Sequence, residues 1–216
     1  MLRYEERKKV IYINDNTIKD CIKTNVFEVL NLEECTDSIS GLYEQLFFIY
    51  SLEKESNNKD YEYLIKYEKN MSDNAYIQLP NKVALQGFIR ILEAFFNLEV
   101  HHPIGTEFKE QLLFSLEGSL LAHKYLLCGT EYDYRENIGR FVNDVKFLPK
   151  KACLALRYGT NEGSGNLFWL HEIGCFVNEL IEARYEGVEI IYFPFSYSHD
   201  DSKSGIVEID IFITGS

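Results

Sequence analysis

The chain of 216 residues carries 34 acidic and 22 basic side chains, and its 46% hydrophobic content is ordinary for a globular protein. A net charge of −12 argues against direct binding to nucleic acid or to a membrane surface, because both are anionic. The first residues lack the apolar core of a signal peptide, so we expect none, and no apolar run reaches the ~18 residues of a membrane span. The five cysteines show no metal-type spacing, so we expect reduced thiols in the cytoplasm and no cofactor.

Short apolar segments at the start of the chain predict a mixture of strands and one helix. Residues 10–13 read as a strand that ends in the turn residues 14–16. Apolar residues at helical spacing predict a helix over 37–54. Tyrosines then alternate with charged residues over 61–68, which predicts a strand with a tyrosine face, and residues 75–79 complete a hairpin.

The middle of the chain has the features of a helical layer. Asn81 can cap a helix over 82–97, whose apolar residues form one stripe. Thr106 can cap a second helix that runs to Leu127, and the pattern predicts a third over 131–146.

The last third of the chain predicts a β-α-β-β unit. It begins with a strand over 152–158 and a Gly-rich loop over 159–166. An amphipathic helix over 167–185 follows, and then two strands joined by a hairpin loop. Pro194 places the first of these two strands at an edge or a bulge.

These elements together predict an α+β or mixed α/β fold, in which a block of about three helices packs with a mixed sheet. A single domain over 1–216 is the favoured organisation. The alternative is a subdivision into an α/β part (1–80), a helical layer (81–151) and an acidic part (152–216).

The charge of the chain is concentrated at its end. Residues 152–216 carry ten acidic and three basic side chains, which accounts for more than half of the net charge. The last strand alternates apolar residues with Glu208, Asp210 and Phe212, and we expect these three on a solvated face. With Glu189, Asp200 and Asp201 they form a predicted acidic and aromatic patch for a basic protein partner.

The helix over 167–185 contains the sharper chemical signal. On a helical wheel His171 and Cys175 fall on the polar side, one turn apart, so their side chains are neighbours. A thiol beside an imidazole is a candidate for a nucleophile or for two metal ligands. The favoured interpretation is nevertheless a cysteine packed at a domain boundary beside a solvated histidine, and no further metal ligands are evident, so no metal is predicted.

The Gly-rich loop is a second candidate site. It follows a strand and opens a helix, where free backbone N–H groups bind anions. Arg157, Gly163, Ser164 and Gly165 are its candidate ligand-binding residues. The pattern matches no known phosphate loop and Glu162 would repel a phosphate, so a structural turn is favoured.

Three functions follow from these features. The favoured one is a binding protein that docks on a basic partner, as an inhibitor, immunity protein or antitoxin does. The second is a small enzyme or ligand-binding domain with its site at the Gly-rich loop and the following helix. The third is a self-associating structural subunit that pairs through an exposed tyrosine strand, which contains Tyr61, Tyr63 and Tyr67. The absence of a catalytic motif favours a protein that is not an enzyme.

Overall fold

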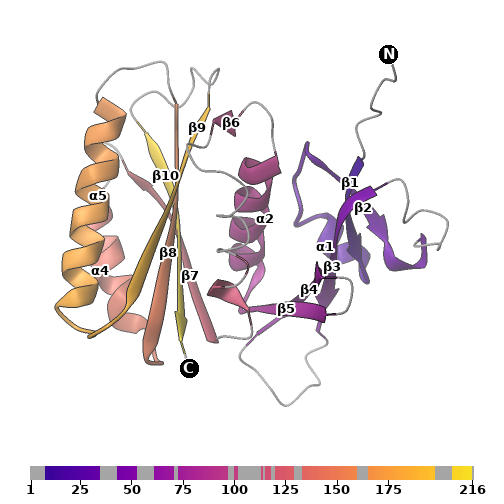
Figure 1. Cartoon of the computed structure of the whole chain (residues 1–216), viewed down its shortest axis with the longest axis horizontal. Helices are drawn as coiled ribbons and strands as arrows, with labels where there is room; N and C mark the ends of the chain where they lie inside the picture. The colour runs from indigo at the N-terminus through magenta and orange to yellow at the C-terminus, as the bar shows by residue number, and fades with distance from the viewer. Residues whose placement is uncertain are drawn as a thin grey trace. The chain divides into compact units, whose positions relative to one another are not determined.

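A computed structural model describes most of the chain, and its contacts divide it into two compact units, Met1–Glu93 and Ala94–Ser216 (Figure 1). The boundary falls inside a helix rather than at residue 80 or 151. The described residues are 8–34, 43–52, 61–70, 73–96, 100–101, 113, 115–117, 120–128, 133–159, 165–197 and 206–215.

The first unit is built on a five-stranded mixed sheet with the strand order β2-β1-β3-β4-β5. Its elements are β1 (Lys8–Ile13), α1 (Asn16–Lys19), β2 (Phe27–Asn31), the 3₁₀ turn Leu32–Glu34, β3 (Tyr43–Ser51), β4 (Tyr63–Asn70), β5 (Asp73–Leu79) and the beginning of α2 (Lys82–Phe96). Strand β1 runs parallel to β2 and β3, whereas β3, β4 and β5 pair antiparallel. The sheet therefore combines one parallel and one antiparallel half.

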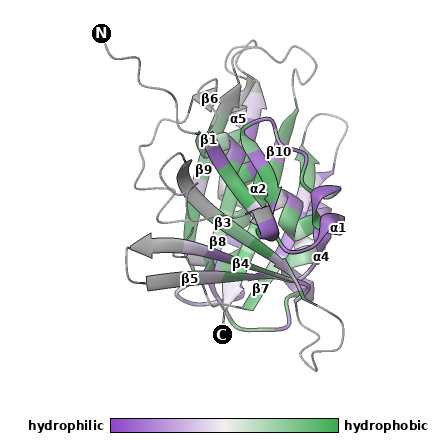
Figure 2. Ribbon diagram, turned by 90° about the vertical axis from the view of Figure 1, so that its right-hand side faces the viewer, coloured by the Kyte–Doolittle hydropathy of each residue, from purple (hydrophilic) through white to green (hydrophobic). Residues whose placement is uncertain are grey.

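Helix α2 begins where the sequence predicts, because the Asn81 side chain accepts a hydrogen bond from the Ala84 backbone N–H (3.0 Å). Figure 2 shows the helix banded with hydrophobic and hydrophilic residues, as an amphipathic helix requires. Phe88 is fully buried on its apolar side and meets Phe47 of β3 edge to face, with ring centroids 6.4 Å apart. The helix thus supplies core to the first unit.

The second unit contains another five-stranded mixed sheet, with the order β6-β9-β8-β10-β7. Its elements after α2 are β6 (Val100–His101), β7 (Leu120–Cys128), α4 (Tyr134–Asp144), β8 (Pro149–Gly159), α5 (Gly165–Glu182), β9 (Glu189–Tyr197) and β10 (Val207–Gly215). Strands β8 and β9 are parallel and α5 connects them, while β10 lies antiparallel between β8 and β7. This order makes β10 a central strand, and all nine of its residues are buried.

Helices α4 and α5 cover one face of the second sheet (Figure 1). Their buried residues pack against alternate residues of the central strands; this core includes Ile138, Val142, Ile173, Val177, Ile181, Leu154, Leu156, Ile209 and Ile211. On the opposite face Phe95, from the end of α2, lies 5.8 and 5.0 Å from the rings of Phe193 and Phe195. Both faces of the sheet are therefore packed.

The predicted α+β fold is confirmed, and so are the strands at β1, β4, β5 and β8 and the helices at α2, α4 and α5. One side of β9 pairs with β8 along the part that contains Pro194. On the other side of β9, β6 pairs only with Tyr197 and Ser196 among the described residues. That is the edge position which the proline predicts.

One predicted helix is wrong in its described part, because residues 43–51 form β3. The helix predicted to run to Leu127 is wrong in its second half, because residues 120–128 form β7, whereas its described residues 113, 115 and 116 are helical. In both strands most of the described side chains are buried or half-buried, whichever face of the sheet they lie on. The sequence of such a strand lacks the polar and apolar alternation of a half-exposed strand. The predicted hairpin between the last two strands is also wrong, since β8 lies between β9 and β10. The prediction of an exposed tyrosine face is also wrong, because Tyr67 is only 5% exposed and Tyr63 is half-buried.

Gly215 ends β10 at a point where no side chain fits. A Cβ at this position would lie 2.1 Å from the backbone oxygen of Leu148 and 2.6 Å from the Phe147 ring. We expect Gly215→Ala to lower the free energy of unfolding by about 1–3 kcal/mol, the usual cost of overpacking. Urea unfolding would measure it, with Gly139→Ala on α4 as the control because nothing lies within 4 Å of a Cβ there. An unchanged stability for Gly215→Ala would contradict the packing of this end of the sheet.

Candidate functional site

The exposed side of α5 contains an open groove. The groove holds about 420 Å³ and is lined by Leu170, His171, Gly174, Cys175, Asn178 and Glu179 of α5, with Tyr192 of β9 beside them. We call these seven residues the α5 groove. The Tyr192 ring lies against Gly174, where a Cβ would be in ordinary van der Waals contact, 3.4 Å from Tyr192 Cε1.

Tyr192 is held in this position by a hydrogen bond. Its hydroxyl donates to the Gly174 backbone carbonyl at 3.0 Å, which ties β9 to α5. Burial, and then the nearby Cys175, raises the pKa of the Tyr192 hydroxyl, so the group stays a neutral donor. One wall of the groove is thus fixed by the fold.

The predicted juxtaposition of His171 and Cys175 is confirmed. Both side chains are exposed, and Cys175 Sγ lies 3.9 and 3.6 Å from His171 Nδ1 and Nε2. Cys21, Cys128 and Cys153 are also free thiols but are buried, and burial raises the pKa of Cys128 and of Cys153 to about 12. Among these four described cysteines, Cys175 is therefore the one that can react with solutes.

Glutamates continue from the groove along the exposed side of α5. Glu179 lies at the groove, Glu182 follows one turn later and Glu186 lies in the turn beyond the helix; all three are exposed. Within the described part of the chain none of them forms an ion pair, whereas Glu172 pairs with Arg135 (3.1 Å). We call Glu179, Glu182 and Glu186 the acidic ridge.

The carboxylates predicted on the last strand do not form a surface patch. Glu208 is 9% exposed, and Asp210 and Phe212 are fully buried, because β10 is central and packed on both faces. Glu189 is apart from them, at the start of β9, where it pairs with Lys151 (3.4 Å). The expectation of a solvated face is therefore wrong for these three residues of β10.

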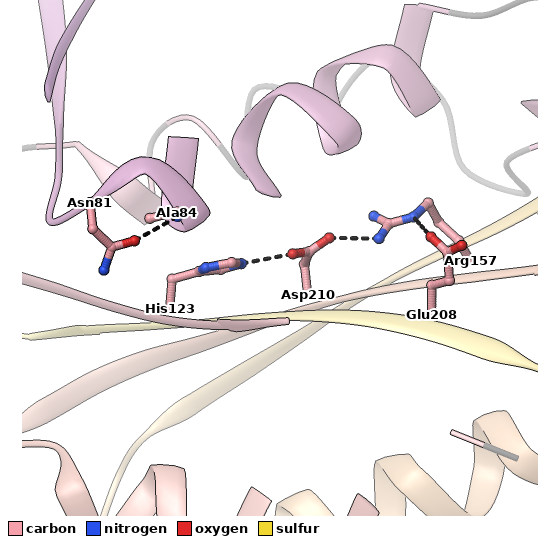
Figure 3. A network of polar contacts seen from close by, with 6 residues as sticks. All are labelled: Asn81, Ala84, His123, Arg157, Glu208 and Asp210. Atoms are coloured by element: carbon pink, nitrogen blue, oxygen red, sulfur yellow. Dashed lines mark hydrogen bonds and ion pairs between the residues drawn. The ribbon is translucent and has the colours of Figure 1, made fainter. Parts of the chain in front are cut away.

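Instead, a row of charged side chains runs inside the second unit (Figure 3). Asp210 accepts a hydrogen bond from Arg157 Nη2 at 2.6 Å and lies 2.7 Å from His123 Nε2. Arg157 Nε donates to Glu208 at 3.3 Å. The His123 side chain is fully buried, and its ring centroid lies 4.4 Å from that of the Phe212 ring. We call His123, Arg157, Glu208 and Asp210 the buried network.

The buried network joins three adjacent strands, β7, β10 and β8, by side chains as well as by the backbone. It also removes Arg157 as an anion ligand of the Gly-rich loop, since its side chain is 2% exposed and held by two carboxylates. Such an arrangement is structural, because desolvated charges are costly unless they are paired. Sequence reasoning missed His123, whose partner Asp210 is 87 residues away.

The other predicted positions are less informative. Asp200, Asp201, Gly163 and Ser164 lie outside the described residues, and Gly165 is the first residue of α5. Where the chain is described, no three or more His, Cys, Asp or Glu side chains are arranged to hold a metal ion. None of the described helices has the length and apolar character that crossing a membrane requires.

Comparison with known proteins gives only remote likenesses. No family model matches the chain, and no curated protein does. Among solved structures it is similar to the FtsZ W319Y mutant of M. jannaschii, with 16% identity and a TM-score of 0.39 over 64% of this chain and 42% of that one. It is also similar to the empty FtsZ dimer of the same organism, with 12% identity and a TM-score of 0.39 over 82% of this chain and 47% of that one. The chain thus spans less than half the length of either.

Proposed function

We propose that the protein binds a basic protein partner through the α5 groove and the acidic ridge. The observation that carries this proposal is the position of Glu179, Glu182 and Glu186, three exposed carboxylates without an ion pair in the described structure, beside an open groove. Unpaired surface charge attracts a partner of opposite sign and speeds the encounter. The groove adds apolar surface from Leu170 and Tyr192, where a partner's side chain can be anchored.

This proposal keeps the predicted class of partner and moves the binding surface from the last strand to α5. An inhibitor, immunity protein or antitoxin uses such a surface, because its target presents a cationic site. The free thiols support a cytoplasmic location, where cysteines remain reduced.

The variant Glu179→Lys plus Glu182→Lys tests the surface. Reversing two charges at the groove should weaken binding to poly-L-lysine by about tenfold or more, since like charges would then face each other. Binding is measured by titration calorimetry at low and at high salt, and added salt should weaken the wild-type interaction.

The matched control is Glu33→Lys plus Glu62→Lys, which changes the net charge equally at two exposed positions of the first unit. If both double variants lose the same affinity, the attraction comes from overall charge and the α5 surface is not the binding site.

A thiol-dependent site for a small molecule is the second candidate, and the contact between His171 and the exposed Cys175 favours it. An imidazole within reach of a thiol can accept its proton and yield the nucleophilic thiolate. Under this function Cys175→Ala abolishes turnover or ligand binding. If Cys175→Ala keeps both turnover and ligand binding, this candidate is wrong.

A further inference from the structure

The turn before β8 presents a basic and apolar surface on the same unit that carries the acidic ridge. Leu148 is 65% exposed, the highest value among the exposed large hydrophobic residues of the described chain. The exposed side chains of Lys146 and Lys150 lie two residues to either side of it, and neither forms an ion pair within the described structure. We call Lys146, Leu148 and Lys150 the basic turn, although Lys150 is already the second residue of β8.

The basic turn is held in place by its neighbours. Val145 and Phe147 pack against the core beneath α4 and α5, and Pro149 pairs with Gly215 at the end of β10. The Leu148 backbone also packs closely against Gly215, where a Cβ would lie 2.1 Å from the Leu148 backbone oxygen. Leu148 is therefore exposed between residues that are packed or paired, an arrangement that favours a low entropy cost of binding.

The basic turn and the α5 groove are complementary in three respects. One presents an apolar side chain and the other an open apolar groove lined by Leu170 and Tyr192. One carries two lysines and the other carries glutamates at and beyond its rim. The two lysines flank Leu148, just as Glu179 lies at the rim of the groove and Glu182 follows it along α5.

We infer that a second copy of this chain is a partner of the α5 groove: Leu148 of one copy inserts into the groove of another, and Lys146 and Lys150 meet the acidic ridge. This inference rests on the proposed function, because it names an occupant of the same site. A patch that fits a pocket elsewhere on an identical molecule produces self-association. Self-association then masks the groove, and a tighter basic partner must displace the second copy.

Cys175 offers a direct test, because it lies in the groove and is exposed. In Leu148→Cys, mild oxidation should join the introduced thiol of one copy to Cys175 of the other, and peptide mapping by mass spectrometry identifies the link. The control Val83→Cys places a thiol at another exposed position, 50% exposed in the wild type. Equal cross-linking of Cys175 by both variants, or none by Leu148→Cys, overturns the inference.

Charge exchange tests the same contact without a covalent bond. Lys146→Glu plus Lys150→Glu makes both surfaces acidic, and Glu179→Lys plus Glu182→Lys makes both basic. Each double variant should be monomeric in sedimentation velocity, with self-association weakened about tenfold or more, while an equimolar mixture should associate again. Association by each variant alone, or none in the mixture or in the wild type, contradicts the inference.

The failures of the two proposals are distinguishable. If poly-L-lysine binds the acidic ridge but Leu148→Cys does not link to Cys175, the basic-partner function stands and self-association through this face is wrong. If the wild type neither binds poly-L-lysine nor self-associates, both proposals are wrong.

Discussion

Asp210→Ala should lower the free energy of unfolding by about 3–5 kcal/mol, the cost of breaking a buried ion pair from one side. Asp210 is fully buried and connects two groups that are themselves buried, Arg157 at 2.6 Å and His123 at 2.7 Å. Removing its carboxylate leaves the guanidinium with Glu208 at a longer distance of 3.3 Å and takes away the partner of His123 Nε2. The free-energy cost of desolvating Arg157 and His123 is then no longer offset by their interactions with Asp210.

Urea unfolding of the full chain measures this loss, with two comparisons. Asp210→Asn keeps the shape and a hydrogen-bonding group, so it should cost less than the alanine variant. Asp144→Ala removes an exposed carboxylate at the end of α4 and should change stability by less than about 0.5 kcal/mol. If Asp210→Ala is as stable as Asp144→Ala, the buried network does not hold the second sheet together.

Phe88→Ala should cost about 3–5 kcal/mol in the first unit, as truncation of a large buried aromatic side chain does. Phe88 is fully shielded from solvent, and its ring meets Phe47 edge to face at 6.4 Å. The variant loses both the buried apolar area and this ring contact, and a cavity remains between α2 and β3.

Phe88→Leu provides the graded comparison, because it keeps most of the volume and should cost clearly less than alanine. The exposed Val83→Ala on the same helix controls for changes in helix propensity. Equal and small effects for Phe88→Ala and Val83→Ala would contradict the assignment of this helix face to the core.

The sequence predicts best those elements whose two faces differ. The β4–β5 hairpin and helix α5 have one buried and one exposed side, and their hydrophobic period identifies them. Helix α2 has its apolar stripe identified in the same way, although none of its residues over 84–96 is exposed. The same argument placed Cys175 and His171 on the polar side of α5 without predicting their exposure, and the structure shows both exposed.

Elements that are covered on both sides lack this signal. The stretch from Leu46 to Tyr50 in β3 is apolar throughout, and spacing alone cannot separate such a strand from a helix. The central position of β10 was missed for a related reason: Glu208 and Asp210 alternate with isoleucines as they would on a half-exposed strand. Their charges are instead satisfied by Arg157 on β8, and no local pattern indicates that long-range pair.

The candidate site was likewise predictable only in part. Neighbouring positions on one helix, such as His171 and Cys175, follow from helical geometry. The groove additionally needs Tyr192 of β9 against Gly174, which depends on how β9 packs beneath α5. The acidic ridge could not be singled out from the sequence, because acidic residues occur throughout the C-terminal stretch. The structure distinguishes it by showing that Glu208 and Asp210 are buried.

Hydrogen–deuterium exchange of the full chain with and without poly-L-lysine tests the central claim most directly. Bound ligand should slow exchange in α5, in the turn that contains Glu186 and in the part of β9 around Tyr192, and high salt should reverse the effect. Slower exchange confined to other segments, or none at a concentration that saturates binding, would contradict docking on the α5 groove and the acidic ridge.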